Sequence, residues 1–320
     1  MQEHNSAVPS SRPLLRSPLA RWNATRGVAR AAALVSAGSM TLVIMATLVK
    51  YLGQDIPAME ILFFRSAIGF LFVLPLFVRD PLEPLRTRRP GMHLVRGAIG
   101  AVGNACFFWT LTHMLMADAM ALQFSRPLFM IPLAMVLLGE VADWRRAAVA
   151  LIGFLGILLY ARPFTGGFEP GALIGALGAL TGGLVVVCIK RLATTEPTRV
   201  IMFYYAFWNA VFALVPAIFL WVTPSLPQLA LLIVIGFLGI AGQGMITHGL
   251  TMGDATVLVP LDYSRIVYSA IFGYLLFSEI PGPWSFAGMA LIVACSLYLV
   301  LTEKKRQAEP PPDDGVSPTR

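Results

Sequence analysis

Residues 117–140, ADAMALQFSRPLFMIPLAMVLLGE, form an apolar run with an arginine near its middle and an acid at its end. Residues 253–279, GDATVLVPLDYSRIVYSAIFGYLLFSE, have the same plan. Three features match in order: Ala117-Asp118-Ala119 with Gly253-Asp254-Ala255, Phe124-Ser125-Arg126 with Tyr263-Ser264-Arg265, and Glu140 with Glu279, each acid fourteen residues after its arginine. Ordered matches of this kind indicate an internal repeat. Each run is also long enough to cross a bilayer as a helix.

The composition of the whole chain agrees with a membrane protein. Of its 320 residues, 57% are hydrophobic and 13% are charged, and the mean hydropathy is +0.73. Soluble domains have about 25% charged residues. Apolar runs recur along the chain without strict alternation, and in lipid only a helix or a closed barrel satisfies its own backbone groups. We therefore predict an all-α integral membrane protein.

Ten transmembrane helices are predicted. They cover residues 31–51, 58–78, 93–113, 117–138, 145–162, 171–190, 200–222, 228–248, 253–277 and 283–301. They make two five-helix repeats, residues 30–163 and 170–302, between a basic cytoplasmic tail, residues 1–29, and a disordered cytoplasmic tail, residues 303–320. The last tail is rich in proline and charge, a composition that stays disordered.

The basic residues predict the orientation. Of the 24 lysines and arginines, 19 flank one side of the predicted spans. The positive-inside rule then places both termini in the cytoplasm of a bacterial-type inner membrane. Because the basic residues sit beside spans, the net charge of +7 does not indicate a nucleic-acid partner. Three arginines fall within spans: Arg65, Arg126 and Arg265.

An odd number of spans in each repeat gives the second repeat the opposite orientation, so the repeat is inverted. Inverted repeats suit alternating access, because exchanging the conformations of the two halves moves the opening of a central site from one face to the other. This arrangement predicts transport of a small solute.

At these residues the chain resembles the EamA-type carriers of the drug/metabolite transporter superfamily. The resemblance covers roughly residues 30–302 and rests on these segments: Phe63-Phe64-Arg65, Ala117-Asp118-Ala119 leading through Pro127 to Leu138-Gly139-Glu140, Trp144-Arg145-Arg146, Gly153-Phe154-Leu155-Gly156 and Phe277-Ser278-Glu279. It implies a ten-helix basket whose central cavity is bordered by spans one, three, four, six, eight and nine. Carriers of this kind take amino acids, nucleotide-like cofactors, vitamins or drugs, and riboflavin and S-adenosylmethionine are therefore candidates.

Arg126 and Arg265 are the leading candidates for substrate binding, because both fall near mid-depth of their spans. An arginine at the bilayer centre costs about 2.5 kcal/mol or more, so it faces a cavity or a counter-charge. Two guanidinium groups, one from each repeat, would bind a carboxylate, phosphate or polarised carbonyl. Asp262, three residues before Arg265, leaves two alternatives open: a structural ion pair with Arg265, or a proton-coupling group.

Aromatic and amide side chains near the arginines are further candidates to contact substrate, with helix packing as the alternative. They are Phe124 and Tyr263, each two residues before an arginine, together with Asn104, Trp109, Gln123, Gln243 and Tyr268. Glu60 and Arg65 lie in span two. We interpret them as residues that stabilise helix packing, or as an ion pair that couples transport to a gradient. Asp118 and Asp254 are expected to cap helix starts, and Glu140 and Glu279 to anchor helix ends.

Several chemistries have no sequence support. The chain has no phosphate loop of the Gly-x-x-x-x-Gly-Lys type, no His-Glu-x-x-His pair and no Gly-x-Ser-x-Gly elbow, so we predict no enzyme activity, cofactor or metal. The leading hypothesis is secondary transport of a small polar or anionic metabolite. Two alternative functions remain: export of drugs or metabolites, and a membrane-embedded enzyme that uses Asp262 and Glu60 on a lipid-linked substrate. The protein could also form a homodimer.

Overall fold

A computed structural model describes residues 18–78, 80, 82–138, 144–161, 169–192, 194–252, 258 and 261–308. Every regular element among the described residues is helical. Glu140 and Asp254, for which the sequence predicted an anchor and a cap, lie outside the described residues, as do positions 1–17 and 309–320.

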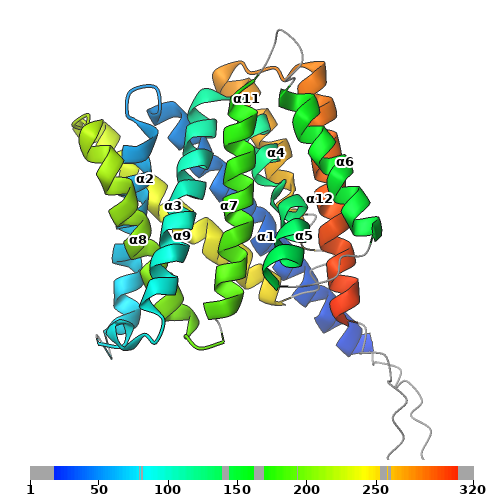
Figure 1. Cartoon of the computed structure of the whole chain (residues 1–320), viewed down its shortest axis with the longest axis horizontal. Helices are drawn as coiled ribbons and strands as arrows, with labels where there is room; N and C mark the ends of the chain where they lie inside the picture. The colour runs from blue at the N-terminus through cyan, green and yellow to red at the C-terminus, as the bar shows by residue number, and fades with distance from the viewer. Residues whose placement is uncertain are drawn as a thin grey trace, which may run out of the picture.

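The helices run side by side in one bundle. Helix α1 begins, and α12 ends, at the lower end of the bundle in Figure 1. The first half comprises α1 (Pro18–Leu52), α2 (Ala58–Val73), α3 (Pro90–His113), α4 (Met116–Gln123), α5 (Arg126–Leu138) and α6 (Trp144–Ala161). The second half comprises α7 (Gly171–Leu192), α8 (Thr198–Phe219), α9 (Leu226–Met252), α11 (Ser264–Phe277) and α12 (Pro283–Ala308). Short 3-10 turns cover Leu74–Phe77 and Pro84–Arg86.

Six described helices are long and apolar enough to cross a membrane. Their apolar segments are residues 29–52, 90–113, 171–189, 199–219, 226–249 and 283–302. Large apolar side chains also stay exposed on the outside of several helices, among them Leu71, Val136, Leu155, Phe219 and Leu275. An exterior of this kind is unfavourable in water and suits lipid. The chain is a multi-pass membrane protein, and the plan of ten spans stays a prediction.

Both end helices are longer than predicted. Helix α1 begins at Pro18, inside the predicted tail of residues 1–29, and α12 continues to Ala308, past the predicted start of disorder at residue 303. Proline is well tolerated at the start of a helix. The residues that extend α12, Glu303-Lys304-Lys305-Arg306, are good helix formers. Helix propensity therefore outweighs the polar composition at both ends.

The fourth predicted span, residues 117–138, is not one helix, because it breaks into α4 and α5 at Phe124 and Ser125. Pro127 explains the break. Its ring would collide with the carbonyl of the residue four positions earlier in a continuous helix, whereas it is accepted at the second position of α5. The Ser125 hydroxyl donates to the carbonyl of Leu122 at 2.6 Å. Arg126 therefore begins a new helix in the middle of the predicted span.

The second half has the equivalent interruption. Tyr263 is a turn residue directly before α11, and the Ser264 hydroxyl donates to the carbonyl of Leu261 at 2.5 Å. This is the same bond, three residues back, that Ser125 makes in the first half. The matched motif, Phe or Tyr followed by Ser and Arg, thus places each arginine in the first turn of a half-helix.

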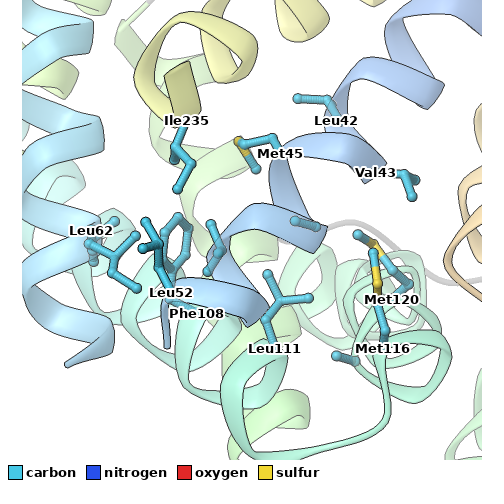
Figure 2. Packing of buried hydrophobic residues seen from close by; sticks show 14 of the residues in the cluster. Leu42, Val43, Met45, Leu52, Leu62, Phe108, Leu111, Met116, Met120 and Ile235 are labelled. Atoms are coloured by element: carbon cyan, nitrogen blue, oxygen red, sulfur yellow. The ribbon is translucent and has the colours of Figure 1, made fainter. Parts of the chain in front are cut away.

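The main apolar core joins α1, α2, α3, α4 and α9, with side chains of α1 such as Val43 and Leu52 between those of the other helices (Figure 2). Helices α1 and α9 approach closely at Gly38 and Gly242. A Cβ added at Gly38 would lie 2.8 Å from the Gly242 carbonyl oxygen. Small residues let helices associate in lipid through such backbone contact. This contact fixes the position of Ser39, the next residue, beside the arginine motif of the second half.

Candidate substrate-binding site

The structure brings the two predicted arginines into one neighbourhood. The Arg265 guanidinium carbon lies 4.9 Å from the centroid of the Phe124 ring, and Phe124 directly precedes the Ser125-Arg126 pair. Arg126 interacts electrostatically with both Arg265 and Asp262. The two halves of the chain therefore contribute their arginines to a shared polar region.

Arg265 is already neutralised within the protein. Its Nη2 forms an ion pair with the Asp262 carboxylate, and the other oxygen, Oδ1 of Asp262, accepts a hydrogen bond from the Ser39 hydroxyl at 2.9 Å. The two side chains of the pair are 20% and 18% exposed. The ion pair that the three-residue spacing predicted as one alternative is thus present, and α1 holds its acid from the opposite side.

Arg126, in contrast, has no ion-pair partner in the part of the chain that the structure describes, and Asp262 acts on it only at longer range. Its Nε is buried without a hydrogen-bond partner, and no described residue forms an ion pair with it. Gly182 on α7 makes room for the side chain, because a Cβ there would lie 2.9 Å from the guanidinium carbon. Gln123 stands three residues before Arg126, where the second repeat has Asp262. The first repeat therefore lacks the neutralising acid.

An aromatic pair lies beside the arginines. The rings of Phe124 and Tyr263 have centroids 4.4 Å apart and an interplanar angle of 35°. Tyr263 is buried and Phe124 is half-buried. Because these residues occupy matching positions in the two repeats, the aromatic pair, like the arginines, joins the two halves.

Asn104 reaches a polar network that the sequence analysis missed. Its Nδ2 donates to the Tyr205 hydroxyl at 2.9 Å and to Oδ1 of Asn209 at 2.8 Å. Tyr205 also interacts electrostatically with Arg126. An amide such as Asn209 inside an apolar span was the signal that could have identified this network, because an unsatisfied amide in lipid is costly.

The remaining candidates are not joined to Arg126 or Arg265 by any hydrogen bond, ion pair or ring contact within the described ranges. The ring of Trp109 stacks on His113 at 4.2 Å, Tyr268 packs against the main core, Gln123 is half-buried at the end of α4, and Gln243 is exposed on α9. These four residues stay predictions as substrate contacts.

Glu60 and Arg65 do not form a pair with each other. The buried Glu60 carboxylate accepts a hydrogen bond from the backbone N–H of Val222 at 3.0 Å. The Arg65 guanidinium lies 5.6 Å from the centroid of the Phe108 ring. Both residues thus contact neighbouring segments of the bundle, as a packing brace would.

Glu279 connects three segments at the end of the bundle opposite the chain termini. Its carboxylate lies 2.5 Å from Nζ of Lys50 at the end of α1 and accepts a hydrogen bond from the N–H of Met116 at 2.7 Å. Met116 is the first residue of α4. The cap of α4 is therefore Glu279 from the other half, whereas Asp118, the predicted cap, accepts a hydrogen bond from the Ser285 hydroxyl at 3.3 Å.

Comparisons with known proteins agree with this architecture. The model of the EamA-like transporter family matches twice, at residues 29–162 and 169–302. An S-adenosylmethionine uptake transporter of Rickettsia bellii is 31% identical over 260 residues, which cover 81% of this chain and 89% of the relative. A pseudopaline exporter of Pseudomonas aeruginosa is 34% identical over 271 residues, which cover 83% and 94%.

A third relative and a solved structure extend the comparison. A riboflavin transporter of Brucella anthropi is 31% identical over 254 residues, 77% of this chain and 88% of the relative. A crystal structure matches 90% of this chain and 99% of its own with a TM-score of 0.53 and 23% identity, which bears on the fold alone. These relatives are transporters of small metabolites rather than enzymes. The chain therefore belongs to the EamA-like transporter family and is a membrane transporter of a small metabolite.

Proposed function

We propose that the transported metabolite carries an anionic group, a cationic group and a planar ring, and that S-adenosylmethionine is the foremost candidate. The unpaired Arg126 is the observation that carries this proposal, because a half-buried guanidinium without an ion-pair partner can be completed by a carboxylate from the substrate.

The other groups of such a substrate also have partners in the site. Asp262, held by Ser39 and Arg265, offers a carboxylate to an ammonium group. The aromatic pair of Phe124 and Tyr263 lies beside the arginines, and its half-buried member, Phe124, can contact a planar heterocycle or a sulfonium. S-adenosylmethionine has all of these groups, and relatives of this chain are named as its uptake transporters. Riboflavin has the planar ring but no carboxylate, so it would leave Arg126 without a counter-ion.

The carrier would work by alternating access of two inverted five-helix repeats, residues 30–163 and 170–302. In this proposal ten helices span the inner membrane and both termini are cytoplasmic. The matched breaks at Arg126 and Arg265 support a site between the repeats, because discontinuous helices of this kind hold substrates in inverted-repeat carriers. Secondary transport needs a gradient, and Asp262 is the candidate group that couples it to protons.

Flux measurements in proteoliposomes test this function. Purified wild-type protein should exchange radiolabelled S-adenosylmethionine, and Arg126→Gln should lower its apparent affinity about hundredfold, since hydrogen bonds to charged groups contribute about 1.5–3 kcal/mol. Arg88→Gln is the matched control, because it removes the same charge from an exposed side chain. Transport of riboflavin in preference to S-adenosylmethionine, or an Arg126→Gln variant equal to wild type, would contradict the proposal.

A further inference from the structure

A second buried arginine, Arg96 on α3, lies on the basic side of the proposed site. Its side chain is only 6% exposed. The guanidinium carbon lies 4.7 Å from the centroid of the Tyr205 ring, and Nη1 donates to the carbonyl of Ile201 at 3.3 Å. Helix α8 therefore covers the side chain.

Arg96 shares the electrostatic character of Arg126. Its Nε is buried without a hydrogen-bond partner, and no described acid forms an ion pair with it. Its electrostatic neighbours are Tyr205, Cys188 and His93. None of these supplies a negative charge in its ordinary neutral or cationic form. Glu196, which interacts electrostatically with His93, already accepts hydrogen bonds from the Thr87 hydroxyl and the Arg88 backbone N–H.

Tyr205 is a neighbour of both cations, at contact distance from one and at longer range from the other. Its ring lies under Arg96, and its hydroxyl accepts a hydrogen bond from Asn104 while donating to no described acceptor. Arg126 is a longer-range electrostatic neighbour. The hydroxyl hydrogen is therefore available to an anion beside Arg96, and each guanidinium has an Nε donor without a partner.

Helix α7 passes both arginines. Gly182 lies against the Arg126 guanidinium, and Cys188, six residues later and about 9 Å further along the helix, interacts electrostatically with Arg96. The two unpaired cations therefore face successive turns of one helix.

We propose that Arg96 and Tyr205 form a second station for the anionic group of the substrate, between Arg126 and the basic side of the membrane. The inference rests on the proposed function and deepens it. When the carrier opens toward its basic side, the carboxylate passes from Arg126 to Arg96, with the Tyr205 hydroxyl donating to it on the way. The anion then remains hydrogen-bonded to charged donors while it leaves the central site.

Side-specific transport kinetics test the second station. We would measure the KM for radiolabelled S-adenosylmethionine from each face, in right-side-out and inside-out vesicles. Arg96→Gln should raise the KM on the basic face about tenfold and leave the KM on the other face within about twofold, because loss of one charged hydrogen bond affects only the face that uses it. Tyr205→Phe keeps the ring and removes the hydroxyl, so it should act in the same direction by about threefold. Arg88→Gln should change neither KM.

The outcomes separate the two proposals. Equal changes on both faces, or no change, in Arg96→Gln and Tyr205→Phe would overturn the second station while a strong Arg126→Gln defect leaves the proposed function standing. Wild-type vesicles without flux of S-adenosylmethionine would overturn both proposals. If Arg96→Gln does not yield folded protein by size-exclusion chromatography, Tyr205→Phe decides, since it leaves the guanidinium and its aromatic contact in place.

Discussion

The two repeats use the same arginine in opposite ways. Arg265 forms an ion pair with Asp262, whereas Arg126 has Gln123 at the matching position and no acid partner among the described residues. The local backbone is alike, with a serine hydroxyl bonded three residues back in each motif. The repeat thus places an arginine at the same position in each half. The difference between Gln123 and Asp262 decides which of the two arginines is free to bind a ligand. The following changes test that asymmetry.

The largest loss of substrate affinity is expected when the first repeat receives an acid at the position that Asp262 occupies in the second repeat. Gln123→Asp places a carboxylate three residues before Arg126, across the same helix break that Asp262 spans to pair with Arg265. We expect the affinity for S-adenosylmethionine to fall about hundredfold, because the substrate must then displace an internal carboxylate. Binding by isothermal titration calorimetry measures the change. Gln123→Asn, neutral and of the same size as Asp, should lose at most a fewfold.

Removing the acid of the second repeat should reduce stability. Asp262→Asn leaves Arg265 without its counter-charge, and we expect a loss of about 2 kcal/mol, below the 3–5 kcal/mol typical of fully buried pairs because this pair is partly exposed. Thermal unfolding of purified protein in detergent measures the loss. The double variant Asp262→Asn/Arg265→Gln should recover most of it. An unchanged pH dependence of uptake in Asp262→Asn would reject Asp262 as the proton-coupling group.

Crowding the free arginine should weaken binding with little effect on folding. Gly182→Ala places a methyl group against the Arg126 guanidinium, at 2.9 Å from its central carbon. The side chain must move, so we expect about a tenfold loss of substrate affinity, equivalent to about 1.4 kcal/mol. Gly183→Ala is the neighbouring control, because its methyl group meets the end of the flexible Leu133 side chain. Equal losses in both variants would point to helix packing instead.

Removing the aromatic contact between the repeats should have the smallest effect. Phe124→Leu keeps an apolar side chain but removes the ring that lies beneath Arg265 and against Tyr263. Cation–π and aromatic contacts contribute about 0.5–1 kcal/mol at partly exposed sites, so the KM should rise about threefold to fivefold. Phe72→Leu, whose exposed ring packs on the exposed ring of Phe237, should leave the KM unchanged.

Much of the central site was predictable from local sequence. The paired arginines were found by their depth and by the repeat, and the Asp262–Arg265 ion pair was predicted as one alternative from the three-residue spacing. The break in the fourth span was not predicted, because hydropathy alone does not distinguish one long apolar helix from two short ones joined at Pro127. The burial of Arg96 was not predictable either, because a count of basic residues does not tell whether a side chain contacts headgroups or another helix.

Composition, periodicity and the repeat by themselves determined the helical membrane class, the presence of two related halves and the identity of their arginines. These features depend on hydrophobicity and on spacing within one helix, both of which are local. The tertiary structure decided which arginine has its acid partner held by a second helix and which stays unpaired, that Glu279 of one half caps α4 of the other, and that Tyr205 of α8 lies under Arg96 of α3. Those contacts join residues far apart in the chain, and only the packing of the helices specifies them.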